Sequence, residues 1–227
     1  MNSCTAMRFV MKHKLGVIVP YRDRLQHLMC FLPAMKTFLN ASNIDHEFYV
    51  IEQQQGKAFN RGKLLNVGFV LAKSTCDYVV MHDVDMLPLE ADYSWVEHPT
   101  HMATECSQFD YRLPYEGYFG GVTSFNCVDF QKTNGYYNEY WGWGAEDDDL
   151  RARCGVAGLN CERRRGRYMS LQHKRIINQD EYYKNIHHLK NFSADRMQND
   201  GLNNLQYDVV EIKHFKEQNG KKYKIFI

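Results

Sequence analysis

Two aspartates with one residue between them, Asp83 and Asp85, follow an apolar run at residues 77–81 and His82. If that run is a strand, residues two apart point the same way, so both carboxylates can face one cation. Carboxylate oxygens suit Mn²⁺ or Mg²⁺, and such ions usually neutralise a diphosphate in proteins. The motif is short and arises by chance in many chains, so a loop of solvated acids is the alternative interpretation. Its place at the end of a predicted strand favours metal binding.

A run of four acids at residues 146–149 is the second candidate for chemistry, and an aromatic, glycine-rich segment at residues 140–144 precedes it. Neighbouring like charges repel, but acids favour a helix N-terminus, and Arg151 and Arg153 stand four residues beyond the second and fourth acids. Such pairing explains Asp149 well and the other acids less well. Tryptophan in a flexible glycine segment suits a lid that stacks on a sugar ring, with nearby carboxylates binding its hydroxyls. We therefore expect a functional role for this segment.

A third candidate is His173, which follows a short predicted strand at residues 168–172. A single histidine is more often structural than a ligand, so its type alone assigns it no role. Basic side chains also lie after the first predicted strand and at the start of the second predicted helix, where a phosphate group would bind. They are Arg22, Arg24, Arg61 and Lys63. A solvated basic surface is the alternative interpretation for these four.

The elements that must position these residues can be predicted from apolar patterns. Buried strands are predicted by three apolar, β-branched runs at residues 15–20, 47–51 and 77–81. Between them, apolar residues at helical spacing predict one helix capped by Asp23 and interrupted by Pro33, and a second helix capped by Asn60. Strands that alternate with helices form crossover connections and a mostly parallel sheet. Ligands bind such sheets beyond the carboxyl ends of the strands, where the aspartate motif stands.

The second half of the chain is less regular. We expect a short helix over residues 147–154 closed by Gly155, and a C-terminal hairpin whose turn is the Asn-Gly pair at 219–220. No repeat, low-complexity block or long linker divides the sequence. The expected fold is one α/β domain at residues 15–227, with a mixed, mostly parallel central sheet flanked by helices, after an N-terminal segment at residues 1–14.

The composition narrows the classes of function. Net charge is +1, from 28 basic and 27 acidic residues, so a broad electrostatic grip on nucleic acid is not supported. The longest apolar stretches are only a few residues, which predicts no membrane span, and the N-terminus lacks the apolar run of a secretory signal. The seven cysteines include no CxxC pair, so buried free thiols are expected, with one or two disulfides as the alternative.

Taken together, these segments resemble the β-1,4-galactosyltransferase family. The matching strings run in the family's order along nearly the whole chain, and the ordered set is highly specific where each string alone is not. They are VPYRDR at residues 19–24, FNRGKLLNVGF at 59–69, HDVD at 82–85, LPY at 113–115, YFGGV at 118–122, YWGWGAEDDD at 140–149 and DGLN at 200–203. The resemblance implies a GT-A fold, a single nucleotide-binding domain. It also implies a UDP-galactose donor, Mn²⁺ and inversion at the transferred sugar carbon.

The resemblance also implies roles for single residues. On the donor side, the residues that would hold the uridine, ribose and diphosphate or close over the sugar are Pro20, Arg22, Arg24, Phe59, Arg61, Asp83, Val84, Tyr118, Gly121 and Trp143. Among them, Tyr118 matches the position that favours galactose over N-acetylgalactosamine, and Trp143 belongs to a mobile loop. Asp85 and His173 would ligate the metal, and Asp147 would be the catalytic base. The acceptor would contact Tyr115, Gly144, Glu146 and Asp148.

Departures from the family pattern leave several points open. The family adds metal ligands as Met-x-x-His or His-x-His, but here Leu171 stands where a His-x-His would begin, so His173 is the single match and Mg²⁺ could also serve. The family's membrane anchor and stem do not match, so we expect a soluble chain, cytoplasmic if complete and in the Golgi lumen if an anchor was removed. The segment at residues 178–199, which would shape the acceptor site, matches poorly. N-acetylglucosamine, xylose and glucose are therefore all candidate acceptors, and no oligomeric state is indicated.

The main hypothesis is thus transfer of galactose from UDP-galactose to a glycan or glycoconjugate acceptor. The same fold could use UDP-N-acetylgalactosamine or UDP-glucose, and Tyr118 argues only against the first of these. A non-catalytic module that binds UDP-sugar or glycan should have lost Asp85 or Asp147, and both are present. A metal nuclease could also use the acidic motifs, but it should carry a more basic surface.

Overall fold

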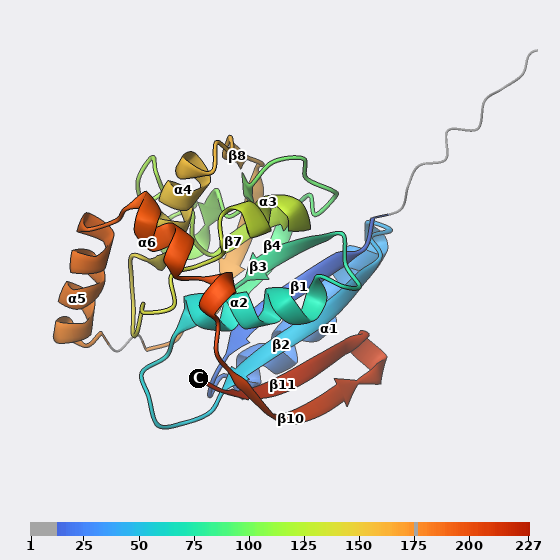
Figure 1. Cartoon of the computed structure of the whole chain (residues 1–227). Coiled ribbons are helices and arrows are strands. Elements are labelled where there is room, and N and C mark those ends of the chain that lie inside the picture. The colour runs from blue at the N-terminus through green and yellow to red at the C-terminus, as the bar shows by residue number, and fades with distance from the viewer. Residues whose placement is uncertain (1–12, 175–176) are drawn as a thin grey trace, which may run out of the picture.

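The structure is a computed structural model that describes residues 13–174 and 177–227. Its main sheet has the strand order β10-β11-β2-β1-β3-β7-β5-β8 (Figure 1). These strands are β1 (Leu15–Tyr21), β2 (His46–Gln53), β3 (Tyr78–His82), β5 (Thr100–His101), β7 (Val122–Asn126), β8 (Glu162–Arg163), β10 (Asp208–Phe215) and β11 (Gly220–Phe226). β1 pairs in parallel with β2 and β3, whereas β7 is antiparallel to β3 and β5. The sheet is therefore mixed and parallel at its centre, as the sequence predicts.

A smaller sheet and the helices complete the domain. The smaller sheet has the order β4-β9-β6, and its strands are β4 (Met86–Ala91), β6 (Glu105–Cys106) and β9 (Gly166–Ser170). The α-helices are α1 (Leu25–Ala41), α2 (Arg61–Ala72), α3 (Cys127–Lys132), α4 (Glu146–Val156), α5 (Gln179–Lys190) and α6 (Ala194–Asn199). Short 3₁₀ turns lie at Ser107–Phe109, Leu202–Asn204 and Lys216–Gln218. In Figure 1, α4, α5 and α6 gather at the end of the molecule toward which β1 runs.

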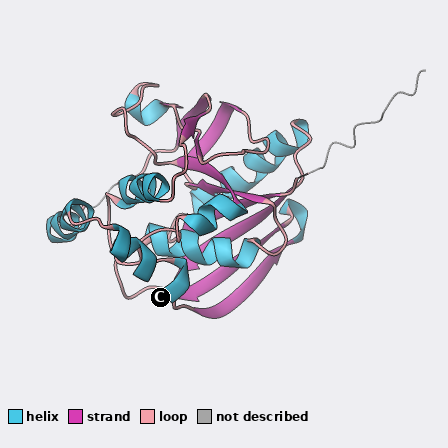
Figure 2. Ribbon diagram, turned by 45° about the horizontal axis from the view of Figure 1, so that its top comes forward, coloured by secondary structure: helices cyan, strands magenta, loops and turns pink. Residues whose placement is uncertain are grey.

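The strand β1 separates two apolar clusters, and its alternation decides which side chains enter each. Val17 and Val19 lie in the cluster that contains the buried face of α1, whereas Ile18 lies in the cluster that contains the buried face of α2. Because successive side chains of a strand point to opposite faces, α1 and α2 cover opposite faces of the sheet (Figure 1 and Figure 2). This packing fixes the first turn of α2 beside the ends of β1 and β3.

Local predictions in the first half are partly confirmed. Asn60 caps α2, because its side chain accepts a hydrogen bond from the Lys63 N–H at 2.8 Å. Asp23 is not a cap: its φ is +53°, and α1 begins at Leu25 without a side-chain cap. Pro33 does not interrupt α1, because it lies on the exposed side while the buried apolar stripe continues along the other side.

In the second half, Gly155 does not end α4, which continues to Val156 and is followed by Gly158 at φ +68°. The C-terminal hairpin is confirmed as the antiparallel pair β10 and β11. Asn219 adopts the left-handed conformation that its turn requires, with φ +52°. The turn is longer than predicted, since it also contains the 3₁₀ turn Lys216–Gln218. β11 pairs in parallel with β2, so the hairpin extends the main sheet.

Some expectations concern residues at the edge of the described chain. Residues 1–12 of the expected N-terminal segment, and Cys4 within it, lie outside the described residues. The six cysteines that the structure describes are free thiols, as expected, but the expected burial holds only for Cys76, Cys106 and Cys154. Cys30 is exposed, and Cys127 and Cys161 are partly buried. Within residues 13–174 and 177–227, no helix is both long and apolar enough to cross a membrane.

Gly68 of α2 packs against β1, and a methyl group placed on it would come within 2.2 Å of the Ile18 side chain. We expect Gly68→Ala to lower the free energy of unfolding by about 1–3 kcal/mol, because overpacking outweighs a gain in helix propensity of ~1 kcal/mol. Gly155→Ala in α4 is the matched control, since nothing meets a methyl group there within 4 Å, and it should raise stability by about 0.5–1 kcal/mol. Urea unfolding measures both, and equal effects would contradict the packing explanation.

Candidate functional site

Arg61, the first residue of α2, joins the two acidic motifs of the sequence. Its Nε donates to Asp83 Oδ1 and its Nη1 donates to Asp147 Oδ1, both at 2.7 Å. The same Nη1 lies 3.7 Å from Glu146 Oε1. Asp83 directly follows β3, and Asp147 lies in the first turn of α4. One guanidinium therefore connects acids that are far apart in the sequence.

Asp147 is a carboxylate in surroundings that oppose its charge. Burial raises the pKa of Asp147 to about 8; Arg61 opposes this shift, whereas the negative charges of Glu146 and Asp83 add to it. Burial likewise raises the pKa of Glu146. A raised pKa makes a carboxylate a stronger proton acceptor, which is the property that a general base needs.

Gly120, which was not among the site residues predicted from the sequence, permits a close approach of the backbone to Asp147. A methyl group placed on Gly120 would lie 2.6 Å from Asp147 Oδ2 and 2.9 Å from the Tyr118 hydroxyl. The next residue, Gly121, has φ +78°, and a methyl group there would lie 3.2 Å from the end of the Met86 side chain. Gly120 thus brings the backbone of this loop against Asp147, whereas Gly121 brings it against Met86. Their adjacency is the sequence signal that could have identified Gly120.

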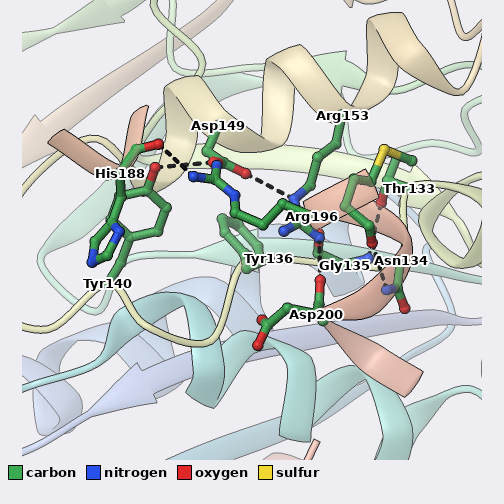
Figure 3. A network of polar contacts seen from close by, with 12 residues as sticks. Thr133, Asn134, Gly135, Tyr136, Tyr140, Asp149, Arg153, His188, Arg196 and Asp200 are labelled. Carbon is green, nitrogen blue, oxygen red and sulfur yellow. Dashed lines mark hydrogen bonds and ion pairs between the residues drawn. The ribbon is translucent and has the colours of Figure 1, made fainter. Parts of the chain in front are cut away.

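A buried network of ion pairs fixes the position of α4 (Figure 3). Asp149 accepts hydrogen bonds from Arg153 Nε at 2.7 Å, from the Tyr140 hydroxyl at 2.9 Å and from Arg196. Arg153 has no exposed surface and also donates to the Asp200 carbonyl oxygen at 2.8 Å. Since a buried charge without a partner is costly, these contacts tie α4 to α6 and to the loop that follows α6.

This network separates the roles of the neighbouring acids. The expected pairing of an acid with the arginine four residues later holds for Asp149 and Arg153. Asp147 pairs with Arg61 instead of the expected Arg151, because the first turn of α4 faces the end of the sheet. No partner was predicted from the sequence for Arg196 or Asp200, which come from the segment after α5.

The aspartate motif at residues 83–85 forms a turn, in which the Met86 N–H donates to the Asp83 carbonyl oxygen at 3.2 Å. The expectation of an extended segment with both carboxylates on one side is wrong, because the chain bends here from β3 of the main sheet into β4 of the smaller sheet. Asp83 belongs to the arginine cluster, whereas Asp85 Oδ2 lies 2.9 Å from His173 Nε2. The two residues expected to ligate a metal therefore lie in contact.

The Asp85–His173 pair offers one carboxylate and one imidazole, donor types that fit Mn²⁺. Burial raises the pKa of Asp85, and the charge of Asp83 adds to this shift while His173 opposes it, so a cation here would relieve an unfavourable charge. Within residues 13–174 and 177–227, no group of three or more His, Cys, Asp and Glu side chains is placed to hold a metal. A metal at this pair would therefore need other ligands, such as phosphate oxygens or water.

The basic residues expected on the donor side surround the start of α1 and the start of α2. Arg24 Nη2 lies 3.0 Å from His173 Nδ1, so a cationic side chain stands next to the expected metal ligand. The guanidinium of Arg22 lies over the Phe59 ring, 5.3 Å from its centre. Two further expected donor residues are buried at strand ends, namely Pro20 and Val84. Arg22 and Phe59 thus form a cationic and aromatic pair, and Arg24 adds a second cation next to His173.

Helix α5 covers the tryptophan segment. Trp143 stacks on Tyr182, with ring centres 5.7 Å apart and planes at 21°. Asn185 donates to the carbonyl oxygens of Trp141 and Trp143, at 2.9 and 3.3 Å. Gly144 has φ +104°, and a methyl group there would contact Tyr182 at 3.4 Å. Tyr182 and Asn185 were not among the residues predicted from the sequence; the adjacent tyrosines at 182–183 were the available signal.

The remaining expected acceptor residues lie at the edge of the cluster. The Tyr115 hydroxyl donates to Asp148 Oδ1 at 2.8 Å, which joins the loop at residues 115–121 to α4. The expected residues thus meet around two centres: the Arg61 cluster and the Asp85–His173 pair. Trp143 contacts α5 through Tyr182. Phe59 is linked to the tryptophan segment, because its carbonyl oxygen accepts a hydrogen bond from the Gly142 N–H at 2.8 Å.

Comparisons with known proteins agree with this fold. The catalytic domain of Drosophila β1,4-galactosyltransferase 7, solved with xylobiose, superposes with a TM-score of 0.80 at 30% identity, over 95% of this chain and 94% of that one. A mutant of the same Drosophila protein, solved with manganese, UDP-Gal and xylobiose, gives a TM-score of 0.75. The fold is of the GT-A type, the class of α/β domain to which these glycosyltransferases belong.

Sequence comparisons identify the family within that class. Two family models match: the N-terminal region of glycosyl transferase group 7 over residues 3–96, and the N-terminal domain of galactosyltransferase over residues 100–174. Human β-1,4-galactosyltransferase 4 is 39% identical over 212 residues, which are 88% of this chain and 60% of the relative. Human β-1,4-galactosyltransferase 6 is 40% identical over 202 residues, 86% of this chain and 52% of the relative. The chain belongs to the β-1,4-galactosyltransferase family and spans about half the length of the curated relatives it matches.

The Arg61 cluster predicts a pH-dependent stability effect. Asp147 has a folded pKa of about 8 against an ordinary 3.8, so stability falls as pH rises through that window. Removing the cation in Arg61→Gln should raise the pKa values of Asp147 and Glu146 further and lower the free energy of unfolding by about 2–4 kcal/mol near pH 8, and by less near pH 5.

Arg165→Gln is the control, because this exposed arginine pairs with Glu105 at 2.7 Å in contact with solvent, so its loss should change stability little at either pH. Denaturant unfolding of both variants at two pH values is the measurement. A loss in Arg61→Gln that is equal at both pH values would contradict the assignment of the effect to buried carboxylates.

Proposed function

We propose that this chain transfers galactose from UDP-galactose to a hydroxyl of a saccharide acceptor, with inversion and with a divalent metal, and forms a β-1,4 linkage. The observation that carries the proposal is the connection of Asp147 to the aspartate motif through Arg61. It puts a carboxylate with a raised pKa next to the segment expected to hold the metal and the donor. The family membership supports the same activity.

The acceptor step needs a base that is placed against the attacking oxygen. Asp147 would take the proton of the acceptor hydroxyl as that oxygen forms a bond to the sugar C1 and the bond from C1 to UDP breaks on the opposite face. Burial of Asp147 supports this role, because it raises the pKa of this carboxylate to about 8, which is close to an ordinary working pH. Glu146 and Asp148 would bind other acceptor hydroxyls, and the Tyr115 hydroxyl holds Asp148 in place.

The donor would lie against the surface formed by Arg22 and Phe59. The uracil ring can pack on Phe59, while the guanidinium groups of Arg22, Arg24 and Arg61 attract the diphosphate. Pro20, Asp83 and Val84 would line the nucleotide site at the ends of β1 and β3. Gly121 would let the backbone approach the donor closely.

Asp85 and His173 would hold the metal, and their contact at 2.9 Å supports their assignment to one site. A divalent cation would stabilise the charge that develops on the leaving diphosphate. Manganese in the complex of the Drosophila relative supports Mn²⁺ as the ion, and Mg²⁺ is the alternative.

The Trp143 segment and α5 would limit water at the site. Trp143 is 44% exposed and stacked on Tyr182, so a sugar ring could pack on the exposed part of the indole. A cover over the donor prevents its hydrolysis and completes the acceptor site. The xylobiose bound to the Drosophila relative supports a xylose-containing acceptor, with N-acetylglucosamine and glucose as the other candidates.

UDP release from UDP-galactose, measured with Mn²⁺, Mg²⁺ or EDTA across acceptors ending in xylose, N-acetylglucosamine or glucose, tests the proposal. We expect release that requires both a metal and one acceptor class. UDP-glucose and UDP-N-acetylgalactosamine serve as alternative donors in the same assay. Metal-dependent UDP binding without release on any acceptor would favour a non-catalytic binding module instead.

Asp85→Ala tests the metal site within that assay. UDP affinity should fall at least about tenfold when metal is present, because the diphosphate loses its bridging cation, and should change little in EDTA. Asp92→Ala, an exposed acid beyond β4, is the control and should leave affinity unchanged. Wild-type UDP affinity in Asp85→Ala with metal would show that this residue holds no metal.

Asp147→Asn tests the base. It should keep UDP affinity within about twofold and lower kcat by about 10²–10⁴-fold, since the amide cannot accept the proton. Asp195→Asn, an exposed acid in the first turn of α6, makes the same chemical change at a helix start and should leave kcat unaltered. Retention of more than about one twentieth of the wild-type kcat in Asp147→Asn would exclude a general-base contribution of the expected size.

A further inference from the structure

The loop at residues 115–121 carries Tyr115, Tyr118 and the two adjacent glycines, and His101 contacts it at Tyr118 and Gly120. His101 lies in β5 with no exposed surface. Its Nε2 lies 3.0 Å from the Gly120 carbonyl oxygen, and its Nδ1 lies 2.8 Å from Arg163 Nη1. Its ring also meets the Tyr118 ring edge-on, with centres 5.3 Å apart and planes at 85°.

These partners determine the state of the imidazole. A guanidinium can only donate hydrogen bonds, so Nδ1 of His101 must accept from Arg163. The ring proton therefore stands on Nε2 and is donated to the Gly120 carbonyl oxygen. Burial lowers the pKa of His101 to about 4, so the ring is neutral at ordinary pH. A neutral ring with this tautomer satisfies both of its neighbours.

Arg163 supplies the other half of this support. It lies in β8, directly opposite His101 in the parallel pairing of β8 with β5. Besides His101, it donates from Nη1 to the Tyr118 carbonyl oxygen at 3.1 Å and from Nη2 to the Glu116 carbonyl oxygen. Together, the arginine and the histidine hold three carbonyl oxygens of the loop, at Glu116, Tyr118 and Gly120.

The loop has little free space on the side that faces Asp147. A methyl group on Gly120 would overlap both Asp147 Oδ2 and the Tyr118 ring, so the tyrosine, the glycine and the carboxylate are already in close contact. A shift of the loop by a fraction of an ångström would change the space between the Tyr118 ring and the acidic cluster. Among the described residues, the polar contacts of Arg163 are with His101 and with the carbonyl oxygens of the loop, so it reaches the acidic motifs through the loop.

We propose that Arg163, with His101, is a positioning residue that sets donor selectivity by fixing the Tyr118 ring where it excludes a bulky substituent on C2 of the sugar. This inference rests on the proposed function, and it extends it to residues that touch neither donor nor acceptor. Removal of the guanidinium lets the loop relax, so the site accepts UDP-N-acetylgalactosamine better relative to UDP-galactose.

Arg163→Gln tests this inference through the ratio of kcat/KM for UDP-galactose to kcat/KM for UDP-N-acetylgalactosamine. We expect the ratio to fall at least about fivefold, a change of roughly 1 kcal/mol in relative transition-state binding. Arg163→Lys should recover part of the selectivity, because it keeps one charged donor for the loop carbonyl oxygens. Arg165→Gln removes an exposed arginine two residues further on and should leave the ratio within about twofold.

A purely structural role for Arg163 gives a different result. If Arg163→Gln lowers Tm or the overall rate while the selectivity ratio stays at the wild-type value, the inference is overturned. A double variant with Tyr118→Leu supplies a second criterion: once the ring is absent, loss of Arg163 should change the ratio no further. Additive effects of the two substitutions on the ratio would also overturn the inference.

Failure of the proposed function is distinguishable in the same experiment. If wild-type protein binds both UDP-sugars but releases no UDP on any acceptor, the proposed transfer fails. The dissociation constants of UDP-galactose and UDP-N-acetylgalactosamine, measured by competition against UDP, then replace kcat/KM in the selectivity ratio. An unchanged ratio in Arg163→Gln overturns the inference, as before. Wild-type protein that binds neither donor would overturn both proposals.

Discussion

The ion pairs of Arg61 are the constraint on which the rest of the site depends. Asp83, Glu146 and Asp147 approach one another from two segments, and without a cation between them their mutual repulsion would destabilise the contact of α4 with the end of β3. Arg61 can reach all three because it is the first residue of a helix that packs against the central strands. The packing of α2 on β1 therefore decides where the acids meet.

Two sets of polar contacts hold the first turn of α4 against the Arg61 cluster. From one side, Asp149, Arg153 and Arg196 bind α4 to α6 through contacts that have almost no access to solvent. From the other side, His101 and Arg163 hold the loop whose glycine lies against Asp147. Both sets consist of charged or polar groups with fixed directions, and such groups define a position more narrowly than apolar packing does. These contacts thereby fix the positions of the acids of the centre.

The first half of the fold was predictable because its signals are local. The apolar runs of β1, β2 and β3 and the cap at Asn60 depend on residues close in sequence, and each is present in the structure. The predictions that were wrong concern places where tertiary packing overrides a local preference. Pro33 stays within α1 because the buried face of that helix stabilises it, and residues 83–85 turn because two sheets meet there.

For the site, the sequence by itself determined which residue types are present and which strand ends carry them. It indicated Asp85, Asp147, His173 and the basic residues near β1 and α2 from their types, their order and their resemblance to one family. Only the tertiary structure decided the partners: Arg61 for Asp147, His173 for Asp85, and Tyr182 for Trp143. The physical reason is that periodicity and capping act over a few residues, whereas an ion pair or a ring stack requires segments that chain order alone does not bring together.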